Sequence, residues 1–194
     1  MYSIKKILKL LIMRKFTFLS LVSLVLAACT TSQELSTSTD NTKKEYKAHT
    51  VAFYNVENLF DIEDDPNTVK HEWTPRGERF YNEEIYWLKQ NNLAKVVADI
   101  GSDFTGTTPT FVGLAEIENY KVLSDLASRA PLKDSEYSIV HYDSPDLRGI
   151  DVALLYKKNE FTLTNSVSHR LDIYDARNKE RKIRTRDQLA VSGI

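Results

Sequence analysis

The sequence has very little cysteine: Cys29 is the only one among 194 residues, which excludes an internal disulfide framework. Histidine is also scarce, and no cluster of cysteine and histidine is present that would predict a zinc site. Neither sign of charge is in large excess, because the formal net charge is -1. This balance argues against a strongly basic protein that coats nucleic acid, while a local basic patch stays open.

The first apolar segment is too short for a membrane-spanning helix, which needs roughly 20 residues. This segment, Phe16–Ala28, follows a stretch with several basic residues, Lys5–Lys15. It ends in the small residues Ala27 and Ala28, directly before Cys29. A positive flank, a short apolar core and small residues at its end are the features of a secretory signal.

The sequence around Cys29 resembles the lipobox of bacterial lipoproteins, in which the cysteine becomes the lipidated first residue of the mature chain. Residues 1–29 are therefore predicted to be a lipoprotein signal peptide, with Met13 as a possible true start. An ordinary signal peptide with an incidental cysteine is the other interpretation. Residues 30–48 are rich in Ser, Thr, Asn and Lys and predict a flexible tether. We expect an exported protein that a lipid anchors to the cell envelope, at a bacterial outer membrane.

Residues 49–194 alternate between two kinds of apolar pattern. Runs rich in β-branched and aromatic residues predict strands at Val51–Tyr54, Thr110–Ile117, Tyr137–Val140, Asp151–Tyr156, Phe161–Val167 and Leu189–Ile194. Helical spacing predicts a helix at Ile85–Ile100 that ends at Gly101, and a short helix at Val122–Ala127 with Leu123 and Leu126 inward. The apolar positions of the first helix are Leu88, Leu93, Val96, Val97 and Ile100. The fifth strand is expected to pair antiparallel with the fourth. This order of elements favours a layered α/β fold with a mixed sheet.

Polar residues at the ends of two predicted strands are the first candidates for chemistry. Asn55 and Glu57 follow the strand Val51–Tyr54 and, two residues apart, point to one side of an extended chain. Glu116 lies near the end of an otherwise apolar strand, where a carboxylate is costly unless it has a partner. Its oxygens suit a hard cation such as Mg²⁺, Mn²⁺ or Ca²⁺. Hydrogen bonding of these groups within strand ends or turns is the structural alternative.

Two loops and a basic stretch supply further candidates. In His141–Val152, Arg148 could hold a phosphate through parallel hydrogen bonds, or it could form a salt-bridged turn with Asp146. The acidic loop Asp61–Arg79 could bind a cation or lie in solvent. The basic stretch Lys179–Arg186 gives weak support to DNA binding.

Three segments, taken together and in this order, resemble the endonuclease/exonuclease/phosphatase superfamily, in particular a bacterial envelope lipoprotein branch. They are Phe53–Asp61 (FYNVENLFD), Gly113–Asn119 (GLAEIEN) and His141–Tyr156 (HYDSPDLRGIDVALLY). The resemblance spans Val51–Ile194. It implies a four-layer α/β sandwich, two mixed β-sheets flanked by helices, of which residues 49–194 would form the N-terminal half.

The resemblance also implies roles for individual residues. Glu116 matches the metal-binding glutamate of the family, and Asn55 and Glu57 match residues that orient the phosphate or the metal. Arg148 lies in a loop that touches substrate in relatives. The implied cofactor is Mg²⁺, with Mn²⁺ or Ca²⁺ as alternatives. The implied substrate is a phosphate ester of nucleic acid, phospholipid or sugar, and no protein partner is expected. His141 and Asp151 recur in that branch, and the resemblance assigns them no chemistry.

The sequence departs from the family in its second half, because the catalytic His, the Asp-x-Asn pair and the terminal Asp-His pair have no identified counterparts. His169 lies in a different context and is expected on a loop or strand surface. We therefore expect a metal-dependent phosphodiester hydrolase domain that is incomplete, and inactive or unstable when expressed alone. A non-catalytic envelope binding lipoprotein with the same fold is the alternative.

Overall fold

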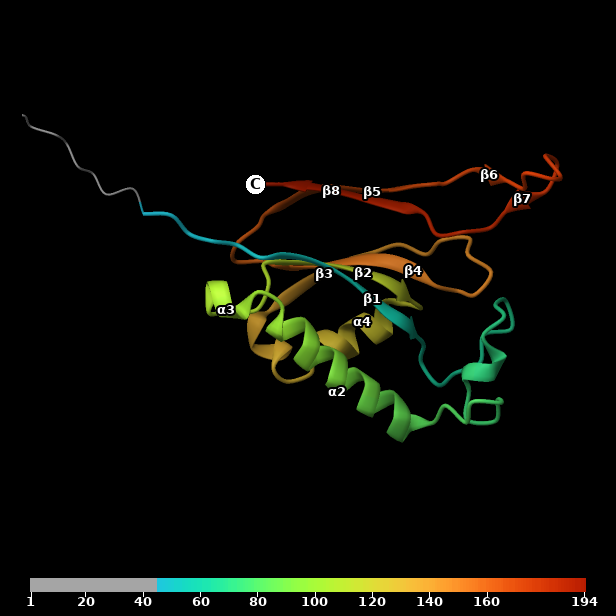
Figure 1. The fold of residues 1–194 in the computed structure, drawn as a ribbon, viewed down its shortest axis with the longest axis horizontal. Coiled ribbons are helices and arrows are strands. Elements are labelled where there is room, and N and C mark those ends of the chain that lie inside the picture. The colour runs from blue at the N-terminus through green and yellow to red at the C-terminus, as the bar shows by residue number, and fades with distance from the viewer. Residues whose placement is uncertain (1–44) are drawn as a thin grey trace, which may run out of the picture. The chain divides into compact units, whose positions relative to one another are not determined.

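A four-stranded sheet lies at the centre of residues 45–194, the part of the chain that the computed structural model describes (Figure 1). Its strands follow the spatial order β1 (Val51–Leu59), β2 (Phe111–Ile117), β4 (Asp151–Lys157) and β3 (Tyr137–His141). β1 and β2 are parallel, whereas β4 is antiparallel to both of its neighbours. The sheet is therefore mixed, as the sequence predicted.

The helices cover one face of this sheet (Figure 1). They are α2 (Glu83–Asp99), the short α3 (Ser102–Thr105) and α4 (Tyr120–Ala127), with 3-10 turns at His71–Trp73 and Leu132–Ser135. Both longer helices begin at an asparagine whose side chain accepts a backbone N–H three residues later: Asn82 for α2 and Asn119 for α4. After α2, Gly101 takes a left-handed conformation (φ 70°), which ends the helix as expected.

The buried face of α2 differs in part from the expected one. The residues of α2 that are buried against the sheet and α4 are Tyr86, Gln90, Leu93, Ala94 and Val97. Leu88 and Val96, which the helical spacing also suggested for this face, are 59% and 44% exposed. Tyr86 is buried instead, and its hydroxyl donates to Asp125 of α4 at 2.5 Å. In α4, by contrast, Leu123 and Leu126 are fully buried, as the sequence predicted.

A second, two-stranded sheet lies on the other face of the central sheet (Figure 1). It pairs β5 (Leu163–His169) with β8 (Gln188–Gly193), and the hairpin of β6 (Ile173–Tyr174) and β7 (Lys182–Ile183) connects them. The Phe161 ring packs at 4.9 Å from the ring of Phe111 and at 5.5 Å from that of Tyr156. The predicted pairing of β5 with β4 is wrong, because β2 and β3 occupy both edges of β4.

The α/β class is confirmed, with a helix layer, a mixed sheet and a two-stranded second sheet in residues 45–194. The second sheet is antiparallel within these residues, and the four-layer sandwich remains a prediction. The predicted signal peptide, Cys29 and most of the tether lie outside the described residues. Within residues 45–194, no helix combines the length and the apolar character needed to cross a bilayer.

Candidate active site at the strand ends

The two parallel strands lose their regular pairing where the candidate residues lie. The pairing runs without interruption from Val51 with Phe111 to Asn55 with Ala115, and it resumes only at Leu59 with Ile117. Between these two pairs, β1 has three residues, Val56 to Asn58, where β2 has only Glu116. A β-bulge of this kind redirects side chains from one face of a sheet to the other.

Three residues in this irregular region have a left-handed backbone. They are Glu57 (φ 53°) and Asn58 (φ 57°) in β1 and Glu116 (φ 68°) in β2. The conformation is uncommon for residues other than glycine and costs on the order of 1–3 kcal/mol each. In β2 it breaks the alternation of side chains, so that Leu114 and Ile117 both enter the core and Glu116 turns out of it.

The carboxylate of Glu116 lies between a backbone N–H and two arginines. Its Oε2 accepts a hydrogen bond from the backbone N–H of Asn58 at 3.0 Å. Its Oε1 lies 3.4 Å from Nη1 of Arg186 and 3.9 Å from Nη1 of Arg148. The side chain of Glu116 is only 15% exposed, so its charge faces these donors rather than open solvent. The structure thus brings Glu116 and Arg148 together, and it adds Arg186.

Arg148 also pairs with Asp146. The loop therefore combines both interpretations of the sequence, a salt-bridged turn and an arginine that could hold a phosphate. The backbone N–H and the Nε of Arg148 both donate to Oδ1 of Asp146, at 2.9 and 3.3 Å. The turn with Asp146 therefore exists, and it presents the guanidinium to Glu116. The half-exposed end of this side chain is free to meet an anion.

Asn55 and Glu57 lie beside this centre in β1. The side-chain oxygen of Asn55 accepts the backbone N–H of Glu57 at 2.8 Å, so Asn55 stabilises the bulge. Within residues 45–194, no hydrogen bond or ion pair links the Glu57 carboxylate to Glu116 or to Arg148. The structure therefore places Asn55 and Glu57 at the site and shows no direct side-chain link between them and Glu116.

Lys89 of α2 holds the bulge from the helix side. Its Nζ donates to the backbone carbonyl oxygens of Glu57 at 2.6 Å and of Asn58 at 3.0 Å. Burial lowers the pKa of Lys89, while the negative charges of Glu57 and Glu116 act in the opposite direction. This contact could not be predicted from the sequence, because Lys89 resembles any other polar residue of an amphipathic helix.

A buried charge network lies just behind the strand ends. Lys70, 2% exposed, contacts Glu118 and lies 2.9 Å from Oδ1 of Asp61. Asp61 donates its backbone N–H to Glu118 at 2.6 Å and accepts the side-chain N–H of Asn119 at 3.1 Å. Burial raises the pKa of Glu118 to about 7, against the effect of Lys70. Asp61, one candidate of the acidic loop, is thus neutralised by Lys70 and is not an open cation site.

A polar cleft of about 370 Å³ adjoins this network and the loop of Arg148. Its lining includes Asp143, Ser144, Asp151 and Arg184. His141, Asp143 and Asp151 offer ligand atoms that lie within 4.8 Å of one another, so they form a possible metal-binding group. Both oxygens of Asp151 already have partners, because Oδ2 contacts Nε2 of His141 at 3.0 Å and Oδ1 accepts two hydrogen bonds from Ser144. This arrangement fixes the loop after β3.

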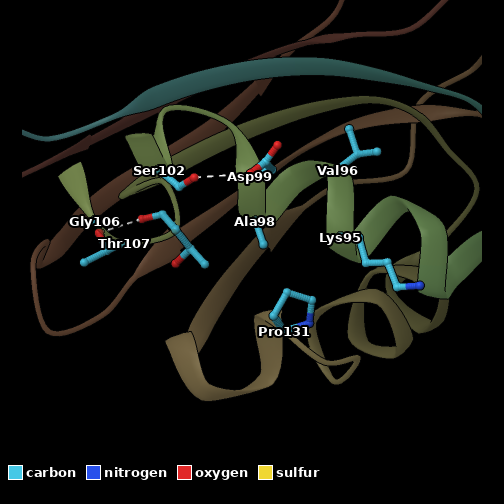
Figure 2. Close-up of a pocket in the computed structure, with 9 residues that line it drawn as sticks. Lys95, Val96, Ala98, Asp99, Ser102, Gly106, Thr107 and Pro131 are labelled. Atoms are coloured by element: carbon cyan, nitrogen blue, oxygen red, sulfur yellow. Dashed lines mark hydrogen bonds between the residues drawn. The ribbon is translucent and has the colours of Figure 1, made fainter. Parts of the chain in front are cut away.

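A second groove, of about 580 Å³, lies at the far end of α2 (Figure 2). Lys95, Asp99, Ser102, Thr107 and Pro131 are among the residues that line it. None of the predicted site residues is in its wall. The strand ends around Glu116 therefore remain the candidate site.

A model of the Endonuclease/Exonuclease/phosphatase family matches residues 50–194. The chain belongs to this family. No curated protein and no solved structure gave a match. Membership in the endonuclease/exonuclease/phosphatase family supports hydrolysis of phosphoester bonds, and divalent metals are general in this family. The lipoprotein branch remains a prediction.

Glu116 itself supplies a carboxylate of the kind that a hard cation takes, whereas the groups that contact it are hydrogen-bond donors. Mg²⁺ binds through one or two protein carboxylates, keeps several waters and takes further oxygens from a substrate phosphate. Glu116 supplies one such carboxylate oxygen, and the guanidinium groups of Arg148 and Arg186 lie 3.9 and 3.4 Å from it. Arg186 was missed in the sequence, where it is only the last residue of the basic stretch Lys179–Arg186.

Proposed function

We propose that this chain carries the metal side of a phosphodiester hydrolase site, with Mg²⁺ as the cation and Glu116 as its protein ligand. The observation that supports this most is the surrounding of Glu116: one oxygen is held by the N–H of Asn58, and the other faces two guanidinium groups. Mn²⁺ and Ca²⁺ would fit the same oxygen. When bound, the cation supplies positive charge to the phosphate under attack.

The residues of this chain would bind and orient the substrate. The guanidinium groups of Arg148 and Arg186 suit two non-bridging oxygens of one phosphate, because each offers donors in a planar fork. Asn55, beside the bulge, would help to orient the phosphate. Glu57, which is exposed on the same strand, would attract the hydrated cation. In this assignment Glu116 would hold the cation, and Arg148 and Arg186 would hold the phosphate of the substrate.

We also propose that the chain by itself hydrolyses diesters slowly. Within residues 45–194, the groups that pair with the Glu116 carboxylate are an N–H and two guanidinium groups, which are donors and cannot accept a proton from water. A general base typically accelerates such a reaction by about 10²–10⁴-fold. Metal binding is therefore a better first test than turnover.

The test compares Mn²⁺ binding to the full-length chain, measured by electron paramagnetic resonance, between the native protein and Glu116→Gln. We expect the affinity to fall at least tenfold, since glutamine keeps the shape of the side chain and removes its charge. Glu136→Gln, at an exposed position that pairs with Lys158, is the matched control. Equal Mn²⁺ affinity in native and Glu116→Gln proteins would refute the metal site. Hydrolysis of bis-p-nitrophenyl phosphate, measured in parallel, reports on the proposed reaction.

Among the possible substrates, charge distribution favours a nucleic acid. Residues 170–187, which we call the basic hairpin, contain seven Lys and Arg against four Asp and Glu, and the rest of residues 45–194 contain twelve against twenty-one. The hairpin extends from the second sheet at the end of the molecule where β1 leads into its loop (Figure 1). It reaches the site through Arg186, and Arg184 donates to the carbonyl of Pro145 at 2.9 Å. A chain of phosphates could follow these cations outward from Glu116.

We further propose that Cys29 carries a lipid and holds the chain to the bacterial cell envelope. The basic stretch, the short apolar segment and the two alanines before Cys29 support this. Labelling with a radioactive fatty acid in a bacterial host tests it. We expect label in the native protein and none in Cys29→Ser; label in both proteins would refute the assignment.

A further inference from the structure

One peptide group lies directly between Lys89 and Glu116. The carbonyl oxygen of Glu57 accepts a hydrogen bond from Nζ of Lys89 at 2.6 Å. The N–H of Asn58 belongs to the same peptide group and donates to Oε2 of Glu116 at 3.0 Å. An ammonium group, a peptide and a carboxylate therefore follow one another in a row, with each dipole aligned to the next.

This peptide group needs support because of the backbone around it. Glu57 and Asn58 both have a left-handed conformation, and neither is glycine. The irregular pairing between Asn55 and Leu59 takes these residues out of the ladder with β2. Carbonyl groups that have lost their strand partner need another donor when they are half-buried. Lys89 serves both of them, because its second hydrogen bond goes to the carbonyl of Asn58 at 3.0 Å, which also accepts the backbone N–H of Phe60 at 3.1 Å.

We infer that Lys89 is a positioning residue for the candidate metal ligand Glu116, and this inference rests on the proposed function. The ammonium group fixes the peptide between Glu57 and Asn58 with its N–H toward Glu116. Its charge also polarises that peptide, which strengthens the hydrogen bond to Oε2. Oε2 is thereby held in place, and Oε1 faces the space between Arg148 and Arg186. Lys89 touches neither the cation nor the substrate in this arrangement.

The test replaces Lys89 with methionine in the full-length chain, which removes the ammonium group and keeps most of the side-chain stem. Substitutions of groups that orient a metal ligand typically cost about 10–100-fold in metal affinity, and we expect Mn²⁺ affinity to fall within that range. Lys89→Arg keeps a donor and is expected to recover most of the affinity. Lys95→Met is the matched control, since Lys95 lies on the same helix, beside the groove at its far end (Figure 2).

A second measurement, on the metal-free protein, separates positioning from a loss of folding. In ¹⁵N–¹H spectra, the amide of Asn58 is expected to lie at low field and to respond to Glu116→Gln, because it donates to that carboxylate. Lys89→Met should move the same amide to higher field, whereas Lys95→Met should leave it unchanged. If Lys89→Met lowers stability and leaves both the Asn58 amide and the Mn²⁺ affinity at native values, Lys89 is only structural and the inference is wrong.

The two hypotheses fail in different ways. If Glu116→Gln does not change Mn²⁺ affinity, the proposed function fails. If Glu116→Gln abolishes Mn²⁺ binding and Lys89→Met does not weaken it, the proposed function stands and the role of Lys89 is refuted.

Discussion

The two ends of the parallel strand pair β1–β2 are built on different principles. At the end where these strands begin, five successive residue pairs, from Val51 with Phe111 to Asn55 with Ala115, follow a regular ladder. At the end where they finish, three residues have a left-handed backbone, and buried charges lie beside the apolar core. Lys70 and Lys89 hold this second end through specific ion pairs and hydrogen bonds. Regular pairing stabilises the fold, whereas the irregular end places Glu116 in the candidate site.

Lys70 gives the largest expected effect at the irregular end. Lys70→Met leaves the carboxylates of Asp61 and Glu118 buried without their cation, and breaking a buried ion pair in this way costs about 3–5 kcal/mol. Urea unfolding followed by circular dichroism measures this loss. The triple variant Lys70→Met, Asp61→Asn, Glu118→Gln should recover much of it, because no unpaired charge remains. A midpoint for Lys70→Met equal to that of the native protein would show that the network does not stabilise the strand ends.

Leu114 tests the regular part of the same strand. Its side chain is fully buried, and Leu114→Ala is expected to cost about 2–5 kcal/mol of unfolding free energy through the cavity that it leaves. The Mn²⁺ affinity of the folded protein should stay within about twofold, since the Leu114 side chain faces the helices and Glu116 turns the other way. If Leu114→Ala weakens Mn²⁺ binding as much as Lys89→Met does, the two ends are not separable.

The basic hairpin contacts the irregular end through Arg186, and we expect a smaller effect, on binding, from changes in it. Arg177→Gln with Lys179→Gln removes two exposed cations, and the salt dependence of binding to a single-stranded oligonucleotide should decrease by about 1.4 in log–log slope. Fluorescence anisotropy of a labelled oligonucleotide measures it. Lys95→Gln with Lys133→Gln makes the same charge change elsewhere and should leave the slope unchanged. Binding to anionic phospholipid vesicles and not to the oligonucleotide would contradict the proposed substrate class.

Glu160 gives the smallest expected effect, at the regular end. Its hydrogen bond from Thr110, with Lys47 nearby, lowers the pKa of Glu160 to about 2. A carboxyl group with a lowered pKa in the folded state contributes stability above its unfolded pKa and loses it as the pH falls toward the folded value. The stability of the native protein should therefore decline between about pH 4.5 and pH 2 in part through this group. Glu160→Gln should make that decline shallower in thermal unfolding; an unchanged pH profile would show that the contact is not coupled to folding.

Much of the regular structure could be predicted from the sequence, because the spacing of apolar residues shows which side of a strand or helix is buried. The bounds of β2, β4 and α4 were predicted to within two residues, and so was the end of α2 before Gly101. The pairing of β5 could not be predicted in this way. Alternating residues show that a segment is a strand with one buried side, and they do not show which strand lies beside it.

The candidate site was predictable only where a residue broke a local pattern. Glu116 stood out as a carboxylate in an apolar run, and Arg148 as a cation beside a turn. Lys89 and Arg186 broke no pattern, since an exposed cation on a helix or in a basic stretch is ordinary. Their roles depend on contacts with residues far away in the sequence.

The sequence by itself determined where the strands of the central sheet and the two longer helices lie, and that a carboxylate would lie near the end of β2. Only the tertiary structure decided how that carboxylate is held. The left-handed residues Glu57, Asn58 and Glu116 are locally unfavourable, so no propensity could indicate them. They persist because the N–H of Asn58 meets Glu116 and the carbonyls of the bulge meet Lys89 of α2. Such hydrogen bonds exist only once helix and sheet have packed together.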